Sequence, residues 1–193
     1  TAYITDVDAP TAVTHVAFLD QYLLANNVNT GKFHFCDFSS SPTTWSALDV
    51  FTAESLPHDL VALYVNQKNI ILMGTESIEF WTNDGVSPFS RITGWTIQRG
   101  VMSKHCTVNI NGLLYFFDDK RKLTVLDMNS HKTLNTSYDK TIQGFGTVSD
   151  CTADYEFFNG QNKIRYIFPT EERTLIYSLD QNYWSEETYY DSS

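Results

Sequence analysis

Residues 107–117 read TVNINGLLYFF, two short apolar runs on either side of Asn111-Gly112. An Asn-Gly pair between two such runs is typical of a tight hairpin, because both residues tolerate the positive φ angles of a type I′ turn. Each run has about the usual length of a strand. The stretch therefore predicts a β-hairpin, and Asn159-Gly160 marks another, in a slightly longer loop between the runs 154–158 and 164–168.

The same order of segments recurs four times along the chain. Each repeat has two apolar strands, then a third strand and a more polar fourth strand. The third strands are expected to begin at residues 32, 77, 122 and 174, which are 45, 45 and 52 residues apart. A period of ~40–50 residues with four strands per unit is typical of β-propellers. We therefore expect an all-β chain: a β-propeller of about four four-stranded antiparallel blades, either complete or part of a larger propeller.

The repeat sets the expected boundaries of a single propeller domain, or propeller fragment, over residues 1–193. The first strand of each blade should be innermost and apolar, since neighbouring blades cover both of its faces. The fourth should be outermost and polar, which discourages edge pairing. The chain begins with Thr1 rather than Met, so we expect a fragment or processed piece of a longer protein. Approximate blades are 11–54, 58–98, 104–140 and 150–190, with a separate outer strand at 1–8 and fourth strands at 44–47, 89–92, 132–134 and 182–185.

Charge and cysteine usage limit the classes of partner. The net charge is −10, with 13 basic and 23 acidic residues, which argues against sequence-specific or wrapping contact with nucleic acid. The one dense basic run, residues 119–122, could contact phosphate, but a solvated turn is the favoured interpretation. The three cysteines are far apart and form no C-x-x-C pair, so one disulfide at most is possible, and we expect reduced, partly buried thiols instead. No apolar run is long enough to predict a membrane span.

Candidate catalytic and metal-binding groups favour a structural interpretation. Within GTESIEFWTNDG, residues 74–85, Glu76 and Glu79 are better explained as a turn residue and a strand residue than as a catalytic pair. Other carboxylate pairs lie at expected turns or near the ends, where the burial needed to tune a pKa is lacking. Calcium at 83–85 or 118–119 would have too few ligands. We expect no enzyme, no cofactor and no metal. The other pairs are Asp6/Asp8, Asp118/Asp119 and Glu186/Glu187.

Several short motifs occur in a fixed order within residues 71–126. They are Gly74-Thr75-x-Ser77-x-Glu79-Phe80-Trp81, then Arg99-Gly100 and the strand after Cys106, then Asn111-Gly112 before Leu114-Tyr115-Phe116. In this order the chain resembles the packaged-DNA stabilisation proteins of short-tailed bacteriophages, also called tail accessory or hub proteins. The resemblance implies a β-propeller in the virion tail, assembled in the host bacterial cytoplasm, that joins the portal to the tail and helps retain packaged DNA. It implies other tail and portal-associated proteins as partners, a homo-oligomer in the virion, and no catalytic residues.

Partner contact should use exposed aromatic and arginine side chains at loop tips. The candidates are Phe89, Arg91 and Trp95, in the long segment after Asp84-Gly85. The alternative is a carbohydrate-binding or glycosidase-like propeller. A glycosidase would need acids or histidines converging from inner strands, which supply His15 and the nearby His58. A carbohydrate-binding propeller would repeat one aromatic in every blade, whereas the third repeat lacks tryptophan.

Overall fold

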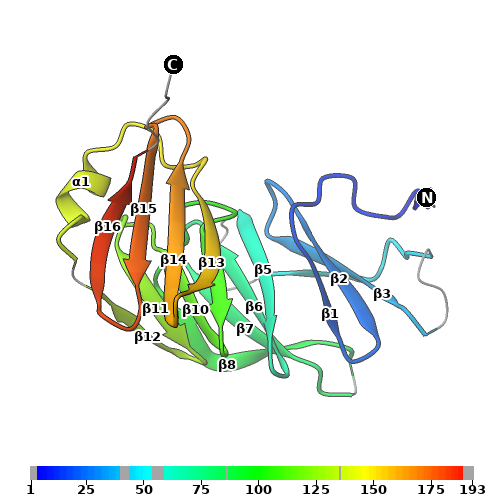
Figure 1. Ribbon diagram of the computed structural model, residues 1–193. Coiled ribbons are helices and arrows are strands. Elements are labelled where there is room, and N and C mark those ends of the chain that lie inside the picture. The colour runs from blue at the N-terminus through cyan, green and yellow to red at the C-terminus, as the bar shows by residue number, and fades with distance from the viewer. Residues whose placement is uncertain (1–3, 40–43, 54–58, 86, 135, 189–193) are drawn as a thin grey trace. The chain divides into compact units, whose positions relative to one another are not determined.

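The computed structural model describes residues 4–39, 44–53, 59–85, 87–134 and 136–188 of the chain (Figure 1). Within them the chain forms strands β1–β16 and one short helix, α1, which confirms the all-β prediction. The strands group into four antiparallel sheets of four strands, each built from consecutive strands. The chain divides into two compact units, residues 1–100 and 101–193, with two sheets in each.

The first unit contains the sheets β1–β4 and β5–β8. Its tight hairpins turn at Asp20 and Gln67, whose φ angles are 54° and 56°, so the left-handed conformation is adopted here without glycine. The strands are β1 (Val16–Leu19), β2 (Tyr22–Asn27), β3 (Lys32–Asp37), β4 (Val50–Thr52), β5 (Leu60–Asn66), β6 (Asn69–Gly74), β7 (Ile78–Thr82) and β8 (Ser90–Ile97).

Buried aromatic side chains fill the space between these two sheets. Phe33 of β3 lies with its ring 5.5 Å from that of Trp81 of β7, edge-on. Phe35 lies 5.3 Å from Phe89, also edge-on. All four side chains are at most 6% exposed. Each aromatic contributes about 1.5–3 kcal/mol by leaving water, so this layer is a principal source of stability for the first unit.

The opposite face of the first sheet is covered by irregular segments. Ala25, Cys36 and Trp45 form a small buried cluster there, with Ala9 packed against it. The side-chain oxygen of Asn26 accepts hydrogen bonds from the backbone N–H groups of Thr14 and His15, at 3.1 and 2.8 Å. This buried amide therefore holds the segment before β1 against the sheet.

Two expectations for this region need correction. The described residues 4–8 form no strand, and a turn closes there where Ala9 N–H donates to Asp6 O at 3.2 Å; residues 1–3 lie outside the described part. The fourth strand of the first sheet is β4, at residues 50–52, and not 44–47. The reason is that Trp45 turns into the small buried cluster, and only the residues after it pair with β3.

The second unit contains the sheets β9–β12 and β13–β16, with helix α1 between them in sequence. The predicted Asn-Gly hairpins are confirmed: Asn111 and Gly112 have φ angles of 53° and 86°, and Asn159 and Gly160 have 50° and 73°. The elements are β9 (Thr107–Ile110), β10 (Leu113–Phe117), β11 (Leu123–Asp127), β12 (Ser130–Thr133), α1 (Asp139–Gln143), β13 (Thr152–Phe158), β14 (Gln161–Phe168), β15 (Arg173–Ser178) and β16 (Tyr183–Glu187).

The core of the second unit also consists of stacked aromatics between two sheets. Phe117 at the end of β10 lies 4.6 Å from the ring of Tyr166 and 6.1 Å from that of Trp184. The start of β13 is joined to the segment before β9, where Ala153 N–H donates to His105 O at 2.8 Å. The two sheets of this unit therefore share both a packed interior and a backbone contact.

The repeat predicted from the sequence is confirmed in its spacing. The third strands begin at residues 32, 78, 123 and 173, each within one residue of its expected position. The expectation that every first strand is covered on both faces is wrong. β5 is largely buried, whereas Val16 of β1 is 65% exposed and Phe157 of β13 is 64% exposed. Irregular segments cover only part of the outer face beside β1, and the far end of β13 forms a hairpin tip.

Candidate functional site

The residues predicted to contact a partner lie in and just before β8. Phe89 is 1% exposed and packs against Phe35 in the core of the first unit. The prediction that Phe89 is an exposed contact is therefore wrong in its premise, because this ring fills the space between two sheets. Arg91 and Trp95 are half-buried, and the Trp95 ring meets Phe80 edge-on at 5.9 Å. Contact of Arg91 and Trp95 with a partner stays a prediction.

Three exposed aromatics occur near the end of β13 instead. Tyr155, Phe157 and Phe158 are 45%, 64% and 55% exposed, and we call them the β13 aromatic tip. Tyr155 and Phe157 point to one face of the strand and Phe158 to the other. Sequence reasoning missed them because residues 154–158 were assigned to an inner strand. The available signal was the pair of acids, Asp154 and Glu156, beside the aromatics. Carboxylates are costly in a strand covered on both faces, so this pattern indicates exposure.

The carboxylates of residues 74–85 do not converge. Glu76 is exposed in the turn before β7, whereas Glu79 is 2% exposed within the strand. The indole N–H of Trp81, two residues on and so on the same face, donates to Glu79 Oε2 at 3.1 Å. The interpretation of Glu79 as a strand residue rather than half of a catalytic pair is supported by this buried hydrogen bond.

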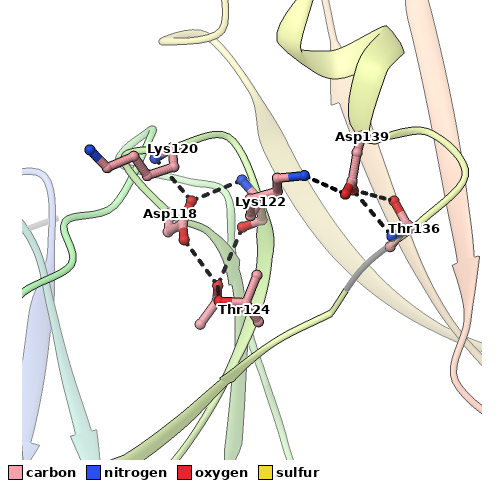
Figure 2. Close-up of polar contacts among 7 residues, drawn as sticks. Asp118, Lys120, Lys122, Thr124, Thr136 and Asp139 are labelled. Atoms are coloured by element: carbon pink, nitrogen blue, oxygen red, sulfur yellow. Dashed lines mark hydrogen bonds and ion pairs between the residues drawn. The ribbon is translucent and has the colours of Figure 1, made fainter.

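The turn between β10 and β11 is organised by a buried aspartate (Figure 2). Asp118 is 1% exposed, and its Oδ1 accepts the backbone N–H groups of Lys120 and Lys122 at 2.9 and 2.8 Å. Its Oδ2 accepts the hydroxyl of Thr124 at 3.3 Å. Burial raises the pKa of the Asp118 carboxyl above its ordinary value, and the backbone hydrogen bonds oppose that shift. This carboxylate is therefore a structural acceptor rather than a solvated turn residue.

The basic side chains of this turn bind the segment around helix α1. Lys122 Nζ lies 2.5 Å from Asp139 Oδ2, and Asp139 Oδ1 also accepts the Thr136 hydroxyl at 2.7 Å (Figure 2). Arg121 Nη1 donates to Gln143 O at 3.0 Å and to Phe145 O at 2.6 Å. A cation at a helix C-terminus satisfies carbonyls that have no partner within the helix.

The basic run therefore differs from the solvated turn expected from the sequence. Of its three cations, Arg121 and Lys122 make contacts with the helix segment, while the Lys120 side chain is 64% exposed and lies 3.9 Å from Asp119. A phosphate contact would compete with carboxylates and carbonyls that already neutralise these groups. The geometry supports a structural clamp that fixes α1 to the third sheet.

The carboxylates of β16 are engaged in separate ion pairs. Glu186 pairs with Arg173, and Glu187 Oε2 lies 3.2 Å from Arg165 Nε. Neighbouring residues of a strand point to opposite faces, so these two carboxylates do not face a common substrate position. Their arrangement stabilises the fourth sheet and lacks the facing geometry of a glycosidase pair.

Other groups considered from the sequence also make structural contacts. Asp6 accepts the backbone N–H of Asp8 at 3.0 Å and of Trp45 at 3.1 Å. His15 Nδ1 lies 3.0 Å from Thr14 Oγ1, while His58 falls outside the described residues. In the described part of the chain no three His, Cys, Asp or Glu side chains are grouped to hold a metal ion. No helix there is long and apolar enough to cross a bilayer.

The three cysteines are buried and unpaired with one another. Burial raises the pKa of all three thiols, and that of Cys106 reaches about 11. A thiol with a raised pKa holds little of the reactive thiolate at neutral pH. These side chains are therefore small core residues, and they are more deeply buried than the partly buried thiols expected from the sequence.

His34 is expected to make the first unit less stable below neutral pH. Both ring nitrogens are buried without a hydrogen-bond partner in the described part of the chain, and burial lowers the pKa of His34, with a smaller effect from Lys32. The unfolded chain therefore binds more protons, so stability is lost as pH falls below about 6.5 toward the folded pKa. We expect the unfolding free energy of His34→Phe to change less than that of the native chain between pH 7.5 and 5.5.

The measurement is urea unfolding at both pH values, because every other titrating group is common to the native chain and His34→Phe and so cancels in their difference. His131→Gln, at an exposed position of β12, is the control and should leave the difference unchanged. Equal pH dependence in His34→Phe and the native chain would contradict the role given to His34.

Comparison with known families identifies the protein family and the fold to which the four sheets belong. Residues 1–186 match the family described as Bacteriophage P22 Gp10, beta-propeller, a phage stabilisation family. The chain belongs to this family. The four four-stranded sheets are thus those of a β-propeller fold, and the sequence resemblance is confirmed. Membership in a phage structural family indicates a virion component and points to a non-enzymatic role.

Solved structures agree on the fold. Hsv2 of Kluyvelomyces marxianus is similar, with a TM-score of 0.53 and 10% sequence identity, over 89% of this chain and 50% of Hsv2. The computationally designed protein Ika8 is similar with a TM-score of 0.51 and 10% identity, over 89% of this chain and 47% of Ika8. The chain spans about half the length of each, and likeness at such identity shows the fold alone. No curated protein sequence matches the chain.

Proposed function

We propose that this chain is a structural part of a phage tail at the head–tail junction, where it joins the portal to the tail and helps retain packaged DNA. The observation that carries the proposal is the match of residues 1–186 to the P22 Gp10 propeller family. The sheets suit such a role, because stacked aromatics within each unit make a rigid support. The partners would be other tail and portal-associated proteins and further copies of the chain.

The acidic net charge supports a surface that DNA can contact without binding to it. The chain carries a net charge of −10, so its average field repels phosphate. The basic turn does not counter this, since Arg121 and Lys122 contact the helix segment. Retention of DNA by this protein would therefore work by blocking a passage and not by gripping the duplex.

The experiment that tests the role removes the protein from its phage. A nonsense mutation in its reading frame, carried by a suppressor host, would give particles lacking the protein when grown without suppression. We expect heads that package DNA and then release it, measured as nuclease-sensitive genome and by electron microscopy as heads without tails. Tailed particles with nuclease-resistant DNA in the absence of the protein would reject the proposal.

The β13 aromatic tip is the contact surface we expect a partner protein to use. Aromatic anchors carry much of the energy of an interface, and replacing one typically costs about 2 kcal/mol or more, roughly 30-fold in affinity. Phe157→Ser with Phe158→Ser should therefore weaken binding of the purified chain to the portal–tail complex by at least about 30-fold. Leu48→Ser is the control, because Leu48 is 88% exposed in the first unit. Equal binding of both variants, measured by surface plasmon resonance, would exclude the tip.

The carbohydrate-binding or glycosidase-like propeller remains the alternative. It would use one aromatic at an equivalent position of every blade. Trp45, Trp81 and Trp184 instead lie before β4, in β7 and in β16, and each is at most 8% exposed. Their burial supports packing within each unit as their role. Binding of one glycan family on an array, weakened by Trp45→Ala alone as well as by Trp184→Ala alone, would favour the alternative, because it requires equivalent sites in different blades.

A further inference from the structure

A pocket of about 470 Å³ opens in the second unit, between the end of β12 and the hairpin that joins β15 to β16. One side is aromatic, with Tyr177, Tyr183 and Trp184. The other side is polar and includes Lys132 and Thr136. A concave space of this size with an apolar wall and a few polar groups is typical of a small-ligand site. None of the contacts described above accounts for it.

One donor of this pocket is open to a ligand. The Tyr177 hydroxyl donates to Asn182 Oδ1 at 3.0 Å, which fixes this exposed amide so that its nitrogen is left to donate. Trp184 is 8% exposed and its indole N–H is buried, so this side chain contributes its ring to the wall of the pocket. A ligand that brings acceptor oxygens would pair with the Asn182 amide.

The charge of the pocket is opposite to that of the chain. Lys132 is exposed on β12 and forms no ion pair within the described residues, and the residues that line the pocket include no carboxylate. In a chain with a net charge of −10, this is a local site for an anion. The ligand should therefore carry a negative group in addition to acceptor oxygens.

We propose that this pocket binds an acidic sugar, a hexuronate unit of an oligosaccharide. Its carboxylate pairs with Lys132, and a ring or hydroxyl oxygen accepts from the Asn182 amide. Its C–H face lies on the ring of Tyr183, which is 48% exposed. An acidic peptide could satisfy Lys132, but a sugar also presents hydroxyl groups that donate to the Thr136 hydroxyl, whose own proton goes to Asp139.

The test is calorimetric titration of the purified full chain with tetragalacturonate, maltotetraose and tetraglutamate. We expect tetragalacturonate to bind at least about tenfold more tightly than maltotetraose, because a charge-assisted hydrogen bond is added. Lys132→Gln should weaken tetragalacturonate by about tenfold or more and leave maltotetraose unchanged. Tyr183→Ser removes the exposed ring on which the sugar face lies, and should weaken both sugars by about three- to tenfold.

Lys120→Gln is the matched control, because it removes a cation whose side chain is 64% exposed outside the pocket. Since Lys132 is itself exposed, its substitution leaves the fold intact and the binding result interpretable. Absence of saturable sugar binding, equal affinity for the two sugars, or equal effects of Lys132→Gln and Lys120→Gln would each overturn the proposal. Binding of tetraglutamate without binding of sugar would overturn it as well, and none of these results bears on the loss of DNA from particles.

Discussion

Gly100→Ala is expected to destabilise the first unit by about 3 kcal/mol, because a side chain has no space there. A Cβ atom at Gly100 would lie 1.9 Å from Thr75 O, 2.1 Å from Thr75 C and 2.6 Å from Glu76 N. All three are backbone atoms of the turn between β6 and β7, so no flexible side chain can move aside. The turn and the segment after β8 would have to separate, which disturbs the buried strands on either side.

The measurement is urea unfolding followed by tryptophan fluorescence, which reports on the first unit through Trp45, Trp81 and Trp95 and on the second through Trp184. Gly144→Ala is the control, since Gly144 has a φ of −79° and a Cβ there would lie 3.4 Å from its nearest neighbour. It should be neutral or slightly stabilising. A Gly100→Ala protein as stable as the native chain would show that this close approach is absent. The same approach gives a physical reason for the Gly74-Thr75 and Arg99-Gly100 motifs on which the family resemblance rests.

Asp118→Ala is expected to cost the second unit about 3 kcal/mol. The substitution leaves the buried N–H groups of Lys120 and Lys122 and the hydroxyl of Thr124 without their acceptor. Each unsatisfied buried donor costs about 1–3 kcal/mol, partly recovered where water enters. Because the turn also positions Lys122 against Asp139, loosening of helix α1 should accompany the loss. Hydrogen exchange of the α1 amides measures that loosening, and urea unfolding measures the stability.

Asp118→Asn separates the charge from the hydrogen bonds. Burial raises the folded pKa of Asp118 above its unfolded value of about 3.9, so the native state binds more protons in the window between the two. The contribution of Asp118 to stability therefore falls as pH rises through that window. Relative to Asp118→Asn, the native chain should gain stability as pH falls from neutral toward 4. A constant difference between the two proteins over this range would contradict the raised pKa.

The sequence alone determined the features that depend on short-range chemistry. Asn111-Gly112 and Asn159-Gly160 form the predicted hairpins, because their backbone conformation depends on the two residues themselves. The spacing of the third strands followed from the alternation of apolar segments and turns, which repeats with the period of a four-stranded sheet. Strand order needed no further information, since each strand pairs with its neighbour in sequence.

Only the tertiary structure decided which side chains are covered. Phe89 was predicted to be an exposed contact residue but lies in the core. Phe157 was assigned to an inner strand but is exposed. The sequence predicted that Arg121 and Lys122 belong to a solvated basic turn. In the structure they bind residues around α1 that lie about 20 positions further along the chain. The pocket combines the end of β12 and the segment after it with residues of β15, β16 and the turn between them, which lie 40 or more residues further along the chain. The burial of a side chain and the identity of its hydrogen-bond and ion-pair partners depend on how segments distant in sequence pack together. Local composition cannot predict that packing.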